Sequence, residues 1–264
     1  MKLDVWRYIA SGPQPGALNM AIDEAMLESN LRGETPPTLR VYTWRPPAIS
    51  LGRFQEAETS LDLTACRDAG VDVVRRPTGG RAILHTDEEV TFSIVISEER
   101  LGTQGTMACY RALASAIVAG LKDLGLDARL VERAGARETR SAQDPACFAV
   151  KARCDLVVGS SKLVGSAQLH RCGAVLQQNS LPLRLRLGDW VRFFRRQPEA
   201  PSAVGLWDAA GAELPHARVA GALRKGFEQT FQVELADGEP TEAEMQRAAE
   251  LASGVDVLSA TAAV

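Results

Sequence analysis

One stretch of the chain combines residue types that could bind an anionic or carbonyl-bearing ligand. It follows a strand-like apolar run at residues 71–74 and reads Arg75-Arg76-Pro77-Thr78-Gly79-Gly80-Arg81-Ala82-Ile83-Leu84-His85. Paired glycines let a ligand approach the backbone closely, because no Cβ stands in the way and φ can be positive. The flanking arginines would hold anionic or carbonyl groups there. A tight β-hairpin whose arginines face water accounts equally well for the local composition.

A second candidate is Lys162, which lies just past a predicted hairpin turn at residues 159–161. A lysine in such a place is most often a solvated charge. Beside a thiol, however, its ammonium group would lower the pKa of the thiol and would face the oxyanion that forms when a thiolate attacks a carbonyl. Lys162 is therefore a candidate catalytic residue if a cysteine lies near it.

The chain has five cysteines, an odd and scattered set without a Cys-x-x-Cys pair. This pattern argues against a disulfide framework and against a structural zinc site, so we expect no metal. Cys147, in the loop ahead of Lys162, is a candidate nucleophile, although a single cysteine is more often a small buried apolar residue. Cys154 and Cys172 are the next candidates, and both fall in predicted strands, where burial is expected.

His85 ends the arginine and glycine stretch and is one of three histidines in the chain. A lone histidine at the end of a strand is more often a structural hydrogen-bonding group than a base. We therefore assign His85 to ligand binding and leave the general base open.

The elements that would position these residues alternate along the first 180 residues. Apolar spacing predicts helices at 19–31, 61–69 and 113–124, and strands at 38–43, 48–51, 71–74, 90–97, 128–131, 154–158, 162–164 and 173–177. This succession predicts an α+β fold in which helices flank a mixed β-sheet.

The sequence changes character after residue 181, and two prolines at residues 197–202 mark a boundary. Beyond it, Val219, Leu223 and Phe227 predict one helix, and a capping box of Thr241 and Glu244 begins another. We therefore predict a catalytic domain over residues 1–200 and a small helical C-terminal extension over residues 201–264.

The composition is that of an ordinary globular enzyme. Of 264 residues, 45% are hydrophobic and 24% are charged, and the net charge is −3, so bulk electrostatics give no support to nucleic-acid binding. A local basic patch within residues 184–196 stays open. The N-terminal residues lack the basic-then-apolar layout of a signal peptide and no run is long enough to span a bilayer, so we expect a cytoplasmic location and no membrane partner.

Several segments together resemble the lipoate-protein ligase and octanoyltransferase family, of which biotin protein ligases are distant relatives. They are residues 19–24, residues 39–44 with 50–55, residues 75–85, and the lysine hairpin at 159–168. The resemblance covers roughly residues 19 to 180, and its motifs are specific in combination. It implies the fold of the biotin and lipoyl protein ligase catalytic domain.

The resemblance also implies roles for individual residues. In this family the arginine and glycine loop lines a pocket for a medium-chain acyl group, and Lys162 falls on the lysine that contacts the acyl carbonyl. Cys147 resembles the nucleophile of the octanoyltransferase branch, whereas ATP-dependent lipoate ligases use no thiol there. Cys147 and Lys162 are thus the implied catalytic residues. The implied substrate-binding residues are Arg75, Arg76, Thr78, Gly79, Gly80, Arg81, His85, Gly165, Ser166 and Ala167.

The implied reaction moves an octanoyl group from acyl-carrier protein, through a thioester on Cys147, to a lysine of a lipoyl domain or a glycine-cleavage H protein, feeding lipoate biosynthesis. The donor and enzyme thioesters have similar free energies and the final amide is more stable, so the transfer requires neither ATP nor another cofactor. Two alternatives stay open. One is an ATP-dependent lipoate-protein ligase that makes an acyl-adenylate with Mg²⁺, and the other is a non-catalytic carrier-protein binding module.

Overall fold

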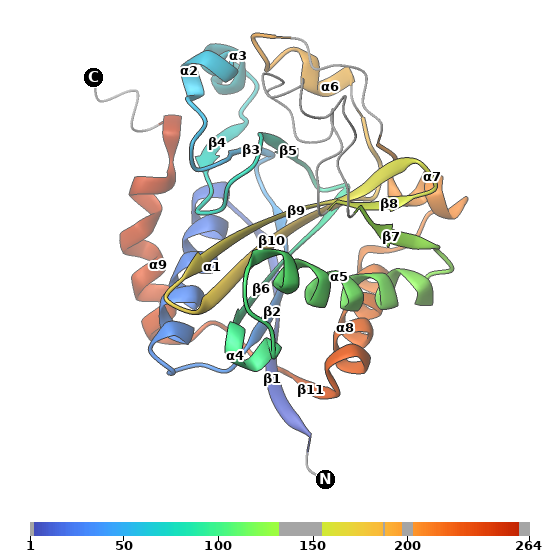
Figure 1. The fold of residues 1–264 in the computed structure, drawn as a ribbon. Helices are drawn as coiled ribbons and strands as arrows, with labels where there is room; N and C mark the ends of the chain where they lie inside the picture. Colours follow the sequence, from blue (N-terminus) through green and yellow to red (C-terminus); the bar gives the residue numbers. More distant parts are fainter. Residues whose placement is uncertain (1–2, 132–154, 187, 197–202, 259–264) are drawn as a thin grey trace.

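A large mixed β-sheet crosses the molecule and carries helices on both faces (Figure 1). The computed structural model describes residues 3–131, 155–186, 188–196 and 203–258. Within them the strand order is β11-β1-β2-β6-β10-β9-β8-β7, with β1 parallel to β2 and β11 and the other neighbours antiparallel. The strands are β1 (Asp4–Gln14), β2 (Thr38–Trp44), β6 (Glu89–Ser97), β7 (Ala128–Leu130), β8 (Leu156–Val158), β9 (Ser161–Arg171), β10 (Ala174–Pro182) and β11 (Val233–Asp237).

A small sheet lies beside one end of the large sheet and carries the arginine and glycine stretch. Its order is β4-β3-β5, with β3 (Ala48–Leu51) parallel to β4 (Asp72–Arg75) and antiparallel to β5 (Ile83–His85). The small sheet is joined to the first helix, because the backbone N–H of Gly16 donates to the Asp72 carboxylate at 3.0 Å. The loop between β4 and β5 is thereby held next to the large sheet.

The long helices form one pair on each face of the large sheet (Figure 1). α1 (Gly16–Leu31) packs with α9 (Glu242–Val255), and α5 (Thr106–Asp123) packs with α8 (His216–Phe231). The shorter helices are α2 (Ala57–Ser60), α3 (Leu63–Asp68), α4 (Glu98–Leu101), α6 (Gly188–Val191) and α7 (Leu206–Ala210). Among the described residues no helix is long and apolar enough to cross a bilayer.

The central strand β6 explains why both faces are covered. Successive side chains of a strand point to opposite faces, and in β6 both sets are buried along nearly the whole strand. Phe92 and Ile94 pack in the cluster beneath α5 and α8, whereas Val95 packs in the cluster beneath α1 and α9. The set that contains Val95 also includes Thr91 and Ser93, whose buried hydroxyls donate to Glu89 and Asp23. Both faces of β6 are therefore buried although polar residues alternate along it.

The expected α+β fold with a mixed sheet and flanking helices is confirmed. The helix expected at residues 19–31 begins three residues earlier, at Gly16, and the capping box of Thr241 and Glu244 opens α9 as expected. Two strands were not expected, β1 and β11. They are parallel neighbours and hydrogen-bond from Asp4↔Val233 to Tyr8↔Asp237, a long-range pairing that leaves no local trace in the sequence.

Residues 203–258 pack closely against the part of the chain that precedes them. β11 lies at the edge of the large sheet, α8 contributes Leu223 and Phe227 to the same apolar cluster as α5, and α9 contributes Ala248 to the cluster of α1. The division of the chain at residue 200 stays a prediction.

Candidate active site

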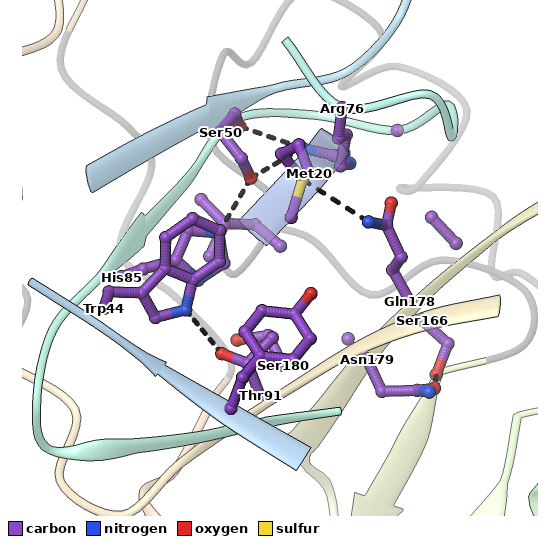
Figure 2. Close-up of a pocket in the computed structure, with 15 residues that line it drawn as sticks. Met20, Trp44, Ser50, Arg76, His85, Thr91, Ser166, Gln178, Asn179 and Ser180 are labelled. Carbon is purple, nitrogen blue, oxygen red and sulfur yellow. Dashed lines mark hydrogen bonds between the residues drawn. The ribbon is translucent and has the colours of Figure 1, made fainter. Parts of the chain in front are cut away.

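A cavity lies where the small sheet meets the large sheet and the N-terminal half of α1 (Figure 2). It encloses about 420 Å³ of empty space, part of which is open to solvent. Its lining residues come from both sheets, from α1 and from the loop after β4. They are Met20, Tyr42, Trp44, Ser50, Arg76, Gly80, Ile83, His85, Thr91, Gly165, Ser166, Ala167, Gln178, Asn179 and Ser180. The apolar and aromatic walls with a few polar groups are typical of a small-molecule site.

The loop between β4 and β5 forms one rim of this cavity. Gly80 has a φ of 92°, in the region that favours glycine, and a Cβ built on Gly52 would lie 1.9 Å from the Gly80 carbonyl oxygen. The two backbones can meet in this way because Gly52 lacks a side chain, and Gly80 is suited to its positive φ because it lacks a Cβ. Of the paired glycines, Gly80 therefore takes part in close backbone packing at the rim of the cavity, whereas a Cβ on Gly79 would meet no atom within 4 Å.

Arg76 holds this loop in place from inside the protein. Its side chain is almost fully buried and donates hydrogen bonds to the carbonyl oxygens of Ser50 (2.8 Å), Gly79 (2.7 Å) and Arg81 (2.8 Å). The bonds to Gly79 and Arg81 fix the backbone on both sides of Gly80, and the bond to Ser50 ties the loop to β3. Arg76 also lines the cavity, so it shapes the rim and borders the space that a ligand would occupy.

Six of the ten residues expected to bind substrate line the cavity: Arg76, Gly80, His85, Gly165, Ser166 and Ala167. The other four, Arg75 at the end of β4 and three residues of the rim loop, are not among the residues that line the cavity. The Arg75 guanidinium donates to the carbonyl oxygen of Gln55 at 2.5 Å, and the Thr78 hydroxyl donates to Gln178 at 2.8 Å. The backbone carbonyl oxygens of Gly79 and Arg81 both accept hydrogen bonds from the Arg76 guanidinium. Substrate contact by all ten residues stays a prediction.

His85 takes part in a chain of hydrogen bonds that fixes its ring. The Ser50 hydroxyl lies 2.8 Å from Nε2 of His85, and Oε1 of Glu89 lies 2.9 Å from Nδ1. Thr91 donates to the same Glu89 oxygen and accepts from Nε1 of Trp44 at 2.7 Å. Since the carboxylate accepts, Nδ1 carries a proton, and in the neutral ring Nε2 then accepts from Ser50. The ring also stacks on Trp44, with 4.0 Å between centroids and 11° between planes.

This chain resembles the arrangement in which a carboxylate orients a histidine toward a hydroxyl. It leaves Nε2 of His85 as an acceptor on the cavity wall, a position from which a ring nitrogen can bind a proton. His85 is therefore chemically able to act as a base, and its ring is already paired with Ser50 and Glu89. The identity of the general base stays open.

Beneath the cavity, the buried carboxylate of Asp23 joins α1 to the large sheet. It accepts hydrogen bonds from Arg40 at 2.8 Å, Tyr42 at 2.9 Å, Ser93 at 2.8 Å and Gln178 at 2.8 Å. Burial raises the pKa of Tyr42 well above its ordinary value of 10.0, and the neighbouring Asp23 carboxylate raises it further. Tyr42 therefore stays neutral and keeps donating to Asp23, which fixes the aromatic wall of the cavity.

One polar group of the cavity wall lacks a partner among the described residues. The hydroxyl of Ser180 is buried and has no hydrogen-bond partner, and the residue lines the cavity from β10. A buried hydroxyl without a partner is destabilising, by roughly 1–3 kcal/mol. Its position makes it available to a polar atom of a ligand or to a water molecule in the cavity.

Lys162 is not a solvated charge. Only 1% of its side chain is exposed, and its ammonium group lies 3.0 Å from the Asp155 carboxylate, of which 3% is exposed. Lys162 is the second residue of β9, and Gly165, Ser166 and Ala167 further along the same strand line the cavity. Asp155 was not expected from the sequence, because it lies before β8 and becomes a neighbour of Lys162 only when β8 pairs with β9.

The predicted nucleophile, Cys147, lies outside the described residues, and so does Cys154. Cys172 was expected to be buried in a strand, and this expectation is wrong. It is exposed in the turn between β9 and β10 and has a positive φ of 48°. It borders a surface hollow that contains none of the residues lining the cavity, so it is poorly placed to act there.

Several residues of the site were not predicted. Glu89 and Gln178 come from two different strands, and each looks like an ordinary strand residue in the sequence. Ser50 lies in the segment 50–55 that carried the family resemblance but was not singled out within it. Asp23 offered a weak signal, since a carboxylate on the same helical stripe as Asn19 can turn toward the core. Asn19 is indeed buried beside it and binds the same Arg40 guanidinium at 2.7 Å.

Comparisons with solved structures define the class of protein. A lipoate-protein ligase A solved with ATP has a TM-score of 0.79 and 26% identity, covering 96% of this chain and 95% of the ligase. The T. acidophilum protein Ta0514, solved with bound lipoic acid, has a TM-score of 0.75 and 27% identity over 95% of both chains. The fold is therefore that of a lipoate-protein-ligase type of catalytic domain.

The sequence identifies the family within this class. The profile of the lipoyl protein ligase A/B catalytic domain matches residues 15–227, and the chain belongs to this family. The octanoyltransferase LipM of Kyrpidia tusciae is 39% identical to it, covering 94% of this chain and 95% of the relative. The octanoyltransferase LipM of Moorella thermoacetica is 38% identical, over 95% of each chain.

Proposed function

We propose that this protein is an octanoyltransferase of lipoate biosynthesis, which moves an octanoyl group from acyl-carrier protein to a lysine of a lipoyl-accepting protein. The observation that carries the proposal is its similarity to octanoyltransferases LipM, at 38–39% identity over nearly the full length of both chains. A lipoyl domain or a glycine-cleavage H protein is the proposed acceptor. A cytoplasmic location stays a prediction.

The cavity supports the acyl group as its ligand. Met20, Tyr42, Trp44 and Ile83 supply an apolar lining suited to an alkyl chain. Burial of each methylene group contributes about 0.8 kcal/mol, so an eight-carbon chain supplies ample binding free energy. The rim loop around Gly80 would lie beside the group, and its fixed backbone favours one orientation of the bound acyl chain.

The proposed chemistry has two steps. In the first, the Cys147 thiolate attacks the carbonyl of the octanoyl thioester. A C–S bond to Cys147 forms, the C–S bond to the carrier breaks, and the carrier thiol leaves after taking up a proton. In the second, the amine of the acceptor lysine attacks the enzyme thioester. A C–N bond forms, the amine loses a proton to a base, and Cys147 leaves as a thiol or thiolate.

Lys162 is the proposed stabiliser of negative charge in both steps. Its ammonium group is buried and held by Asp155 at 3.0 Å, which gives it a fixed position in a region of low dielectric constant. A preorganised cation acts more strongly on an oxyanion there than in water. The Asp155 carboxylate is a positioning group, since it pairs with Lys162 and is not assigned any contact with substrate.

An ATP-dependent lipoate-protein ligase is the second candidate, and one observation favours it. The lipoate-protein ligase A with a TM-score of 0.79 was solved with ATP bound. A ligase of that kind would activate free octanoate or lipoate by forming an acyl-adenylate. The identity to that ligase is 26%, below the 38–39% shared with the octanoyltransferases.

Transfer in purified components tests the proposal. The protein is mixed with octanoyl-acyl-carrier protein and a glycine-cleavage H protein without ATP, and the mass of the acceptor is measured. We expect the acceptor to gain one octanoyl group, and an acceptor whose modified lysine is replaced by arginine to gain none. Modification only with ATP and free octanoate or lipoate would establish the ligase. Binding without modification under both conditions would establish a non-catalytic carrier-protein binding module.

A further inference from the structure

Away from the cavity, three potential metal ligands converge from three separate elements. Glu98 lies in α4, Cys109 in α5 and His170 in β9. Their ligand atoms, a carboxylate oxygen, Sγ and a ring nitrogen, all lie within 4.8 Å of one another. The Cys109 side chain is buried, whereas about a quarter of the Glu98 and His170 side chains is exposed, so an ion could enter from solvent.

A chain of side-chain amides determines which nitrogen of His170 carries a proton. The carbonyl oxygen of Phe92 can only accept, so the amide that faces it at 3.2 Å is the NH₂ group of Asn179. Oδ1 of Asn179 then accepts from Gln177 at 2.7 Å, and Oε1 of Gln177 accepts from Gln168 at 2.6 Å. The oxygen of Gln168 is thereby turned toward Nε2 of His170, at 2.9 Å. Nε2 must therefore donate.

Because Nε2 of His170 donates to Gln168, the second ring nitrogen, Nδ1, faces a negative group. Nδ1 lies 2.8 Å from Oε1 of Glu98. In the neutral ring, with its proton on Nε2, a lone pair on Nδ1 would point at a carboxylate oxygen, and two acceptors would face each other. A cation must separate them, either a second proton on the ring or a metal ion.

We propose that Glu98, Cys109 and His170 bind a divalent ion of the Zn²⁺ class, with the ion replacing that second proton. A thiolate, an imidazole and a carboxylate are the three ligand types that zinc takes in proteins. A soft sulfur and a ring nitrogen disfavour Mg²⁺ and Ca²⁺, which prefer oxygen ligands. Three protein ligands leave a fourth tetrahedral position for water. The hydroxyl of Thr103, 3.5 Å from Sγ of Cys109, lies beside the proposed site.

The groups around the site are those that a zinc ligand requires. A ligating histidine usually donates its other N–H to an oxygen acceptor, which fixes the tautomer. Gln168 fills this role for His170, and its own orientation is fixed through Gln177 and Asn179 back to a backbone carbonyl. The ion would link the neighbouring helices α4 and α5 to β9, which is distant from both in the sequence. The spacing of the cysteines gave no hint of it, because each ligand comes from a different segment.

Metal titration of the full chain tests the proposal, with Co²⁺ as a spectroscopic probe and Zn²⁺ in competition with a chelator. We expect one equivalent of Co²⁺ to give a thiolate-to-metal charge-transfer band that Zn²⁺ removes, and Zn²⁺ to raise the midpoint of thermal unfolding. The Cys109→Ala variant should lose the band. The Glu98→Gln variant, at a partly exposed position, should bind more weakly, and Gln168→Leu should lose roughly 10–100-fold in affinity.

Two controls keep the experiment specific. Cys172→Ser removes the exposed thiol that borders the hollow next to Glu98, and Cys147→Ala removes the proposed nucleophile. Both should bind Zn²⁺ as tightly as the unaltered chain. The proposal is overturned if no ion binds, if the Cys109→Ala and Glu98→Gln variants bind unchanged, or if either control loses the ion. These outcomes do not depend on octanoyl transfer, so they separate the metal site from the proposed function.

Discussion

At the scale of single residues, Asp23 decides whether the cavity keeps its shape. Its side chain and that of Arg40 are both fully buried, and the pair is surrounded by further hydrogen-bond donors. A buried charge that loses its partner is strongly destabilising, whereas the intact pair is close to neutral relative to apolar residues. The main effect of the Asp23–Arg40 pair is therefore to hold Tyr42 and Gln178 in place on the cavity wall.

Replacing Asp23 with alanine should lower the free energy of unfolding by about 3–5 kcal/mol, because Arg40 is left buried without a counter-charge. Urea unfolding followed by circular dichroism measures the loss. The double variant Asp23→Leu/Arg40→Met, which removes both charges, should recover most of it. A loss under about 1 kcal/mol in the single variant would mean that the pair behaves like an exposed one, against this account.

The residue scale also shows what the sequence could and could not predict. The Gly79 and Gly80 pair was recognisable because glycine has a distinctive conformational range, and Gly80 indeed has a positive φ. The partner of Lys162 was not recognisable, since Asp155 reaches it across a hairpin pairing. The contact between Ser50 and His85 likewise depends on the antiparallel pairing of β3 with β5. The sequence therefore showed which residue types could serve the site, but the contacts between them could be known only from the fold.

At the scale of elements, the rim loop and β3 must approach each other closely. Gly52, just after β3, faces the carbonyl of Gly80, and any side chain at Gly52 would force the loop outward. Because Arg76 also binds this loop on the cavity side, a displacement there moves the rim of the site.

The Gly52→Ala variant should therefore slow octanoyl loading by roughly a hundredfold, the loss expected when a positioning element shifts by about 1 Å. Stopped reactions analysed by intact mass give the rate. Gly12→Ala is a matched control, because no atom lies within 4 Å of the added Cβ and Gly12 is distant in the sequence from the loop. Equal loading rates for the two variants would show that the close approach of Gly52 to Gly80 does not control the rim.

The contact between α1 and α9 gives a pH-dependent prediction. Arg247 donates to Glu28 at 2.8 Å, and this hydrogen bond lowers the pKa of Glu28 below its ordinary value. A carboxyl whose folded pKa is depressed adds stability above its unfolded pKa, and that stability is lost as the pH falls through the folded pKa. The Arg247 side chain is 40% exposed, so solvent screening keeps the contribution small.

Arg247→Gln should lower the free energy of unfolding by about 0.3–1 kcal/mol at pH 7. The difference should vanish as the pH falls through the folded pKa of Glu28. Urea unfolding at several pH values measures it. Glu250→Gln, which leaves the contact with Glu28 intact, is the control and should have a smaller effect. A difference that is equal at neutral and acid pH would rule out the ion pair as its cause.

At the scale of the whole molecule, the C-terminal helices complete the core of the preceding strands. α5 and α8 meet where Gly120 and Gly226 bring the two backbones together, and a Cβ on Gly226 would lie 2.3 Å from the carbonyl oxygen of Ala116. This packing explains why local patterns predicted α8 but gave no indication of its partner. The strand β11 was missed for a different reason. Among the described residues it pairs only with β1, and Gly12 and Pro13 in β1 obscure the strand pattern of β1 itself.

Gly226→Ala should destabilise the protein by about 1–3 kcal/mol, because the extra methyl group overpacks the contact between α5 and α8. Gly221→Ala, in the same helix with no atom within 4 Å of the added Cβ, should instead stabilise by up to about 1 kcal/mol through helix propensity. Midpoints of thermal unfolding measure both. If the two variants shift the midpoint alike, the close contact of the two helices is not what limits stability.

The measurement that tests the central claim most directly is the intact mass of the protein after mixing with octanoyl-acyl-carrier protein in the absence of ATP. We predict one octanoyl adduct that hydroxylamine removes, as expected of a thioester. The adduct should be absent from Cys147→Ala and present on Cys172→Ser. No adduct on the unaltered protein, or an adduct that persists in Cys147→Ala, would contradict transfer through Cys147.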